Sequence, residues 1–421
     1  MNRPKTPGDR RAEHASGDAA GANAQFPQRE IIYALLALAW LVAFLGFFYQ
    51  FDLPNDPGDA TRFDLWMILP DLLPPPPVSN GAPYGWRNLP ERFDILLVAG
   101  TILAGAWGFG HLLLRLLRVP LEKPCAERTA FALGIGLAGL SLVALGCGLA
   151  GLLLRWLFGG LIFAAIGAEC FLRLRDRNRL AVESAPAKGR ATPPESPPPV
   201  TEGSGLKWLC LAAMTPFVLV MLLGSMLPTP DFDSRAYHLV GPKEYLEAGR
   251  ISFLEHNVYT SFPFLTEMLT LIAMVLRGDW YRGALAGQLV LACIAPLTAV
   301  ALYAAGRRAL SPSAGWIAAT VFLTTPWVYR ISIIPYAEGG LAFYLFASVL
   351  GVMAGADALR SKSGSSTVND SNTGSAYRFF LVTGLLAGSG MACKYTGLVQ
   401  VVAPIGIAVV LLPFFLRPSL T

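Results

Sequence analysis

The sequence predicts an all-α membrane protein, a polytopic helical bundle with about ten transmembrane helices. Of its 421 residues, 54% are hydrophobic and 14% are charged, and the mean hydropathy is +0.49. A soluble protein of this length needs more charge to cover its surface. Apolar runs near the ~20 residues that cross a bilayer recur along the chain. We expect spans at residues 31–49, 94–114, 129–151, 156–172, 208–227, 283–305, 314–334, 338–356, 378–394 and 398–416.

Residues 1–28 are polar and lack a continuous apolar core. This composition is typical of a disordered cytoplasmic tail and not of a secretory signal. The alternative is a stretch added by a wrongly assigned start codon. The next block, residues 29–175, contains four predicted spans. Its loop between the first two spans carries Trp66, Tyr84 and Trp86, which are typical of anchors at a membrane interface.

A Pro-rich linker at residues 176–206 separates that block from a second membrane module, residues 207–421. Its composition builds no packed core. Within the second module, the run at 262–276 is interrupted by polar residues and is shorter than a span. We therefore expect an interfacial or re-entrant helix there.

The predicted span at 378–394 is short and contains Gly384, Gly388 and Gly390. Small residues at this spacing let helices approach closely in a membrane, and glycine also weakens a helix. Three alternatives follow for this span: it is tilted, broken, or paired closely with a neighbour through its small-residue face.

Lysine and arginine near the span ends orient the bundle, because cytoplasmic loops retain them. Basic residues precede the first span and follow the second and fourth, and continuing the alternation places residues 228–282 outside. This bias and anionic lipid headgroups explain the formal net charge of +5 without a nucleic-acid partner. The six cysteines show no CxxC or His/Cys spacing, so we expect neither a disulfide framework nor a zinc site.

The stretch 231–239, Asp-Phe-Asp-Ser-Arg-Ala-Tyr-His-Leu, lies directly after the fifth predicted span. Charged side chains at a membrane boundary indicate a functional site. Asp231 and Asp233 could each accept a proton or bind a divalent cation. In the alternative interpretation, Asp231 caps the following helix and Asp233 pairs with Arg235.

After this motif, apolar residues recur near helical spacing until Gly249, which predicts an amphipathic helix in the interface. Such a helix would present Lys243 and Arg250 to a phosphate, unless both side chains simply extend to water.

Metal ligation is a further hypothesis for this loop. The candidates are Asp231, Asp233, His238 and His256, with Glu255 nearby. Their spacing is not diagnostic, and each histidine could instead bond to the loop backbone.

Several motifs recur in a characteristic order. They are Asp233-x-x-x-Tyr237-His238-Leu239, Pro242-Lys243-x-Tyr245, Gly249-Arg250, Pro263 with Thr266-Glu267-Met268-Leu269, Ala305-Gly306-Arg307-Arg308, Thr325-Pro326-Trp327, and Gly384-x-x-x-Gly388 to Lys394-Tyr395. In this order they resemble bacterial polytopic GT-C glycosyltransferases, which use polyprenyl-phosphate sugars. The resemblance covers residues 207 to about 417, and the first four spans lie outside it.

This resemblance implies a GT-C-like module in the bacterial inner membrane. Such an enzyme moves a hexosyl or pentosyl group from a polyprenyl-phosphate donor to an envelope lipid, glycan or protein on the outer face. Asp233 matches the family's catalytic acid and would be the general base, with Asp231 as a supporting ligand. The resemblance requires no cofactor and leaves a divalent cation open.

Other residues take roles by the same resemblance or by their position. Glu338 would be a second acid that binds the acceptor, a sugar hydroxyl or a metal, or else a carboxylate favoured by its helix N-terminus. Lys394 would bind the donor phosphate, or else extend to the interface. Arg330 is another candidate phosphate ligand. The remaining substrate-binding candidates in the motif are Arg235, Tyr237 and His238.

Two other classes of protein remain open. A non-enzymatic transporter or flippase would also place polar loops beside spans, although the chain shows no pair of broken helices in repeated halves. The resembling enzymes usually continue beyond a point equivalent to Thr421, so an incomplete, inactive scaffold is the third interpretation. The chain contains no nucleotide-binding glycine loop and no HExxH motif.

Overall fold

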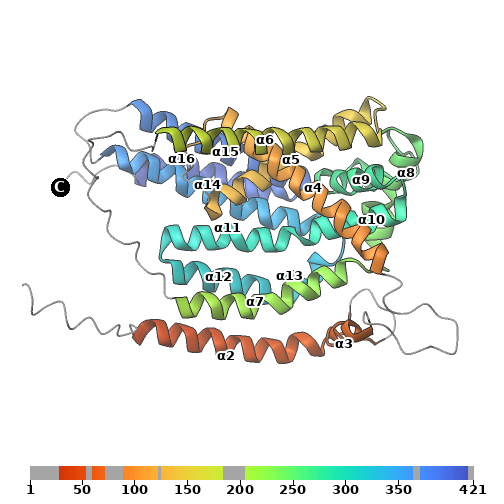
Figure 1. Cartoon of the computed structure of the whole chain (residues 1–421), viewed down its shortest axis with the longest axis horizontal. Helices are drawn as coiled ribbons and strands as arrows, with labels where there is room; N and C mark the ends of the chain where they lie inside the picture. The colour runs from red at the N-terminus through yellow and green to blue at the C-terminus, as the bar shows by residue number, and fades with distance from the viewer. Residues whose placement is uncertain are drawn as a thin grey trace, which may run out of the picture.

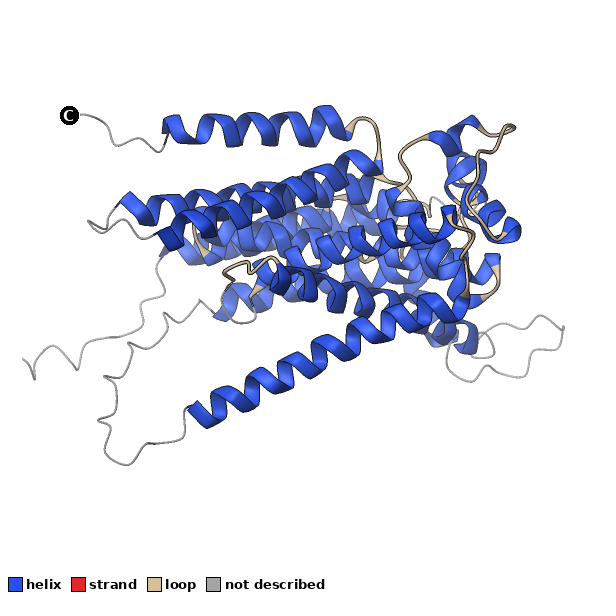
Figure 2. Cartoon of the chain, turned by 90° about the horizontal axis from the view of Figure 1, so that it is seen from above, coloured by secondary structure: helices blue, strands red, loops and turns tan. Residues whose placement is uncertain are grey.

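The computed structural model describes residues 28–53, 59–71, 89–121, 125–183, 204–363 and 370–415. The predicted tail, apart from residue 28, and residues 184–203 of the predicted linker lie outside these ranges. Helices account for most of the described chain, as Figure 2 shows, and the one β-bridge in these ranges is isolated, between Asp52 and Thr61. The prediction of an all-α membrane protein is confirmed at this level.

The first block contains α2 (Gln28–Gln50), α3 (Asp64–Asp71), α4 (Leu89–Leu116), α5 (Ala126–Leu149) and α6 (Arg155–Glu183). The second begins with α7 (Ser204–Ser225), the π-helical turn η3 (Ser234–His238), α8 (Val240–Ala248), the 3-10 turn η4 (Val258–Ser261) and α9 (Leu265–Arg277). It continues with α10 (Trp280–Ala292), α11 (Ile294–Ala309), α12 (Pro312–Thr324), α13 (Pro326–Ser332), α14 (Glu338–Ser363), α15 (Asp370–Cys393), η5 (Leu398–Val402) and α16 (Ala403–Phe415).

Eight helices in the described ranges are long and apolar enough to cross a membrane, and α10 and α11 together form one of them. The predicted spans at 314–334 and 398–416 correspond to shorter apolar helices. The first is interrupted between α12 and α13, because Pro326 has no backbone N–H to continue the helix. The expected number of about ten is therefore reached only if these two shorter helices also cross.

Two predicted boundaries differ from the structure. Helix α6 continues to Glu183 and α7 begins at Ser204, so helix extends into both ends of the linker expected at 176–206.

The run expected as an interfacial or re-entrant helix forms α9, which is buried from Leu265 to Val275. The interfacial alternative is wrong, because Thr266 and Glu267 bond to one another inside the protein. The re-entrant alternative stays a prediction.

The two blocks share one hydrophobic core. Figure 1 shows the long helices lying side by side, with α2 and α7 along one side of the bundle and α6 along the other. Helices α4 and α5 of the first block pack against α9, α10 and α11 of the second, and their buried residues belong to one cluster. The motif of residues 231–239 and helices α3 and α8 lie at one end of the bundle, here called the motif end.

Close helix packing in the second block depends on glycines of α14. A Cβ placed on Gly351 would lie 2.3 Å from the Thr383 side chain of α15, and one on Gly355 would lie 2.6 Å from Phe380. By contrast, a Cβ on Gly384 or Gly388 of α15 would meet nothing within 4 Å. Helix α15 is continuous, so it is not broken, and its Gly384–Gly388 face is not the one that pairs closely.

Candidate functional site

The motif folds into a π-helical turn that leads into α8. Asp233 precedes η3 with φ −63° and ψ −36°, and its side chain makes no capping hydrogen bond. Helix α8 ends at Gly249, whose φ of 69° is in the left-handed region that favours glycine. The predicted helix after the motif is therefore confirmed.

Asp231 bonds to two residues of the second block that lie far from it in the sequence. Arg330 of α13 donates Nη2 to the Asp231 carboxylate at 2.8 Å, and the Tyr336 hydroxyl donates to its other oxygen. The Asp231 side chain is 13% exposed. Burial raises the pKa of Asp231, but Tyr336, Arg330 and the Ser234 backbone outweigh it and hold the pKa below its ordinary value. The aspartate that pairs with an arginine is therefore Asp231, and the arginine is Arg330.

A second acidic pair lies beside the first. His238 Nδ1 and Glu267 Oε1 are 2.5 Å apart, and both side chains are buried. The other Glu267 oxygen accepts a hydrogen bond from Thr266 at 3.0 Å. The His238 ring lies against the Tyr336 ring, with centroids 5.1 Å apart, so this pair adjoins the partners of Asp231.

A third pair joins Glu338, the first residue of α14, to Lys394, just after α15. Lys394 Nζ donates to Glu338 Oε1 at 2.6 Å, and both side chains are partly exposed. The other oxygen of Glu338 is buried and has no hydrogen-bond partner among the described residues. The charges of Glu338 and Lys394 therefore neutralise one another. The second oxygen of Glu338 can still accept a hydrogen bond, and the ammonium group of Lys394 stays partly exposed.

Asp233 differs from these carboxylates. Within the described ranges, no hydrogen bond or ion pair reaches its side chain. Its charge acts on Tyr237: burial, followed by the charges of Asp233 and Glu267, raises the pKa of Tyr237 to about 12. Asp233 is thus the carboxylate of this group whose side chain has no bonding partner in the described part of the chain.

An aromatic wall connects Tyr237 with Lys394. Tyr237 stacks on Tyr259 at a centroid distance of 5.4 Å, and its ring also lies near Phe262. Phe262 in turn contacts Tyr395, the neighbour of Lys394, at 5.6 Å. Flat apolar faces therefore line the space between the motif and the third pair.

Two apolar cavities lead away from this wall along the bundle. The first, of about 290 Å³, is bordered by Phe262 and Phe264, and the second, of about 440 Å³, by Gly384 and Gly388. Both are lined by Leu142 of α5, Leu265 of α9 and Ala392 of α15. Helix α5 of the first block thus forms one side of this apolar space.

The remaining predicted residues lie apart from the three pairs. Lys243 lies 4.6 Å from the Trp280 ring centroid and contacts Glu247, and His256 pairs with Glu244 at 3.0 Å. Arg235 and Arg250 are exposed. No three His, Cys, Asp or Glu residues in the described ranges are arranged to hold a metal ion, and the metal candidates Asp231, His238 and His256 each bond to a different partner.

The structure adds functional candidates that the motif analysis did not assign. Glu267 and Tyr336 belong to the pairs and their surroundings. Arg62 of the first block is 6% exposed, with its guanidinium 4.5 Å from the Tyr329 ring centroid. The sequence features that could have pointed to these residues were an acid inside an apolar run, for Glu267, and an arginine in the loop between the first two spans, for Arg62. No feature of the sequence pointed to Tyr336.

Comparisons with known proteins identify no family for this chain. No protein-family model, no curated protein and no solved structure matches it.

Proposed function

We propose that this protein is a glycosyltransferase of the bacterial inner membrane. It moves a hexosyl or pentosyl group from a polyprenyl-phosphate donor to an envelope lipid, glycan or protein on the outer face. The observation that carries this proposal is that no bond from a described residue reaches the Asp233 side chain, whereas Asp231, Glu267 and Glu338 are each bonded to a basic partner. A general base must be free to accept a proton, and Asp233 meets that requirement.

In the proposed reaction, Asp233 accepts the proton of the acceptor nucleophile as that nucleophile attacks the anomeric carbon of the sugar. The bond from the acceptor to the anomeric carbon forms, and the bond from that carbon to the phosphate oxygen breaks. Polyprenyl phosphate leaves with the bonding electrons, so negative charge grows on its oxygens. Cations near the reacting atoms stabilise that charge.

Two cations at the motif end suit the leaving phosphate. Arg330 uses Nη2 for Asp231, while its Nη1 is buried without a partner in the described part of the chain. Lys394 is 43% exposed and adjoins the aromatic wall. A phosphate that accepted from both would satisfy the buried donor of Arg330, which is costly to leave unpaired.

The apolar cavities support a lipid-linked substrate. They extend from Phe262 and Phe264, at the aromatic wall, to Gly384 in the body of α15. A hydrocarbon chain placed there would bury apolar surface while its phosphate stayed at the motif end. A transporter or flippase of polyprenyl lipids could use the same space, so the test must detect bond cleavage.

The test incubates purified full-length protein with radiolabelled polyprenyl-phosphate sugars and envelope acceptors. We expect labelled acceptor and released polyprenyl phosphate. Replacing Asp233 with Asn should lower the transfer rate by at least about 100-fold, the usual contribution of a general base, without changing membrane insertion. The control is Glu247→Gln, which removes an exposed carboxylate of α8.

Full activity of Asp233→Asn would refute the base assignment. Transport of the labelled lipid across a vesicle membrane without release of polyprenyl phosphate would favour the flippase instead. Adding EDTA to the same assay determines whether transfer needs a divalent cation.

A further inference from the structure

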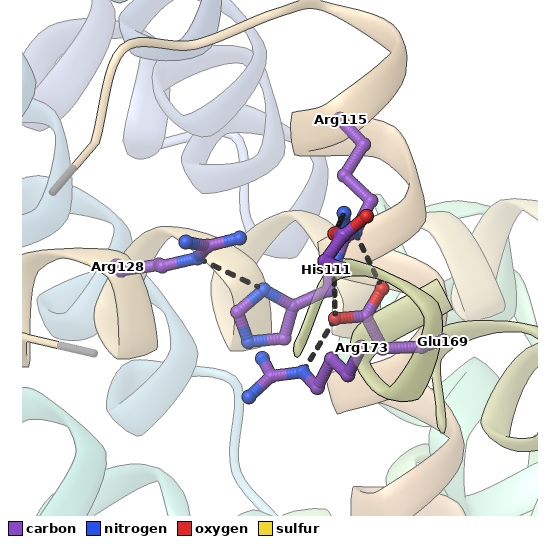
Figure 3. A network of polar contacts seen from close by, with 6 residues as sticks. His111, Arg115, Arg128, Glu169 and Arg173 are labelled. Carbon is purple, nitrogen blue, oxygen red and sulfur yellow. Dashed lines mark hydrogen bonds and ion pairs between the residues drawn. The ribbon is translucent and has the colours of Figure 1, made fainter. Parts of the chain in front are cut away.

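A second polar cluster lies at the end of the bundle opposite the motif end, between α4, α5 and α6 (Figure 3). Its centre is Glu169 of α6, whose side chain is fully buried. Arg115 of α4 donates Nε to Glu169 at 2.8 Å, and Arg173 donates Nε to it at 2.6 Å. Arg115 also donates to Asp176 at 2.6 Å. The bonds of Arg115 join α4 to α6, and the Arg173 bond lies within α6.

Arg128 of α5 enters the cluster differently. Its Nε donates to His111 Nδ1 at 3.4 Å, as drawn in Figure 3. A ring nitrogen that accepts a hydrogen bond carries no proton, so His111 is neutral in this arrangement. No carboxylate of the described residues pairs with Arg128, while Arg115 and Arg173 act on it as like charges.

Among the described residues, the charges of the cluster are therefore unbalanced. Three guanidinium groups, from Arg115, Arg128 and Arg173, face the two carboxylates of Glu169 and Asp176. The Glu169 bonds explain why α4 and α6 carry arginines. They do not explain Arg128, because a neutral ring does not compensate its charge and the two helices are joined without it.

The surroundings place this excess charge at an apolar boundary. Leu116 of α4 is 75% exposed and Leu174 of α6 is 59% exposed, on the same turns as the arginines. Arg173 also lies over the Trp107 ring at 4.4 Å, and tryptophan is typical of the membrane interface. Exposed leucines and a tryptophan beside charged groups are the arrangement expected where lipid headgroups meet hydrocarbon chains.

We propose that this cluster binds the phosphate of an anionic phospholipid in the leaflet opposite the motif end, with Arg128 and Arg173 as its donors. Guanidinium groups match phosphate oxygens with paired N–H groups. A phosphate there balances the third positive charge, and the lipid's acyl chains lie along the exposed leucines of α4 and α6. Basic sites between transmembrane helices recognise headgroups in this way. The site is separate from the motif end and does not depend on the transferase proposal.

The experiment uses delipidated full-length protein in detergent and native mass spectrometry with added phosphatidylglycerol. Phosphatidylcholine, whose headgroup has no net charge, is the comparison lipid. We expect the protein to prefer phosphatidylglycerol. Replacing Arg128 with Gln should weaken its binding by at least about fivefold, from the loss of one charge near the membrane surface. The control variant Arg177→Gln removes an exposed arginine of α6, the helix that carries Arg173, and it should bind phosphatidylglycerol as the wild type does.

Arg128→Lys keeps the charge and should retain part of the binding, which guards against a folding defect in Arg128→Gln. A separate arm measures the unfolding temperature with inorganic phosphate alone. If phosphate stabilises the wild type and not Arg128→Gln, and phosphatidylglycerol adds nothing, the phosphate site stands but its ligand is free phosphate and the lipid assignment falls. Equal effects of both ligands on Arg128→Gln and Arg177→Gln would overturn the proposal.

Discussion

At the scale of single residues, two aspartates separated by one position have different chemistry because they meet different partners. Asp231 lies ahead of the π-helical turn, where it reaches Arg330 and Tyr336. Asp233 precedes the turn itself and keeps a side chain without a bonding partner in the described chain. Under the proposed function, this difference assigns Asp231 to the support of the site and Asp233 to proton transfer.

Replacing Arg330 with Gln should raise the pKa of Asp231 towards its ordinary value of about 3.9. Burial raises this pKa, and without Arg330 only Tyr336 and the Ser234 backbone still lower it. In the wild type the folded pKa lies below the unfolded one. Stability from this carboxylate is thus fully present above the unfolded pKa and is lost as pH falls through the folded one. We expect the unfolding temperatures of wild type and variant to differ most near neutral pH and to converge below about pH 4.

The measurement is thermal unfolding in detergent at several pH values. Arg235→Gln is the control, since Arg235 is exposed, and it should change the unfolding temperature little at any pH. A difference for Arg330→Gln that stayed constant down to the lowest pH would show that Asp231 does not depend on this arginine.

At the scale of helices, glycines serve two purposes in neighbouring elements. Gly351 and Gly355 of α14 allow close contact with α15, whereas Gly384 and Gly388 of α15 leave open space at an apolar cavity. The sequence showed small residues at helical spacing. It did not show which glycine faced a helix and which faced a cavity, because that depends on the rotation of each helix within the bundle.

Leucine at position 388 should extend into the cavity, since Gly388 lines it and a Cβ there meets nothing within 4 Å. If the donor's hydrocarbon chain uses this space, Gly388→Leu should raise the KM for the polyprenyl donor at least about tenfold, because several buried CH₂ groups lose their place. The unfolding temperature should not fall, since leucine favours a helix more than glycine does. Steady-state kinetics with varied donor concentration provides the measurement.

Gly167→Leu is the matched control. Gly167 is an exposed glycine of α6 that also meets nothing within 4 Å, and it lines neither cavity. Unchanged KM in both variants would show that the donor chain lies elsewhere.

At the scale of the whole molecule, the first block is an integral part of the bundle. Besides the shared core, Arg308 of α11 bonds to Glu127 of α5 at 2.7 and 3.0 Å and to Asp357 of α14 at 2.6 Å. Near the motif end, Arg277 of α9 pairs with Asp94 of α4. Ion pairs therefore join the blocks towards both ends of the helices.

Two fragments, residues 1–183 and 204–421, should associate when they are expressed together. The shared core supplies most of the affinity, and Arg308 adds a partly buried charge network whose loss leaves Glu127 without this partner and Asp357 with only the longer contact to Arg360. Arg308→Gln should therefore reduce recovery of the pair in an affinity pull-down, while the exposed neighbour variant Arg307→Gln should not. Fragments that elute separately in the wild type would contradict the shared core.

Much of the fold could be predicted because bilayer-length apolar runs form helices wherever they lie. The run at 94–114 became α4, and Gly249 ended α8 as its backbone freedom suggested. The structure departs from the simplest expectation where a local pattern had two meanings. Pro326 interrupted a span, and the polar residues of α9 indicated an interface although they bond to one another and to His238 in the interior.

The sequence by itself determined the class of protein, the approximate helices and the stretch that carries the acidic motif, because hydrophobicity and helix-ending residues act locally. Only the tertiary structure decided which charges meet. The pairs of Asp231 with Arg330, of His238 with Glu267 and of Glu338 with Lys394 join residues far apart in the chain. Such pairs depend on how the helices pack and rotate, since a buried charge is stable only where that packing supplies its partner.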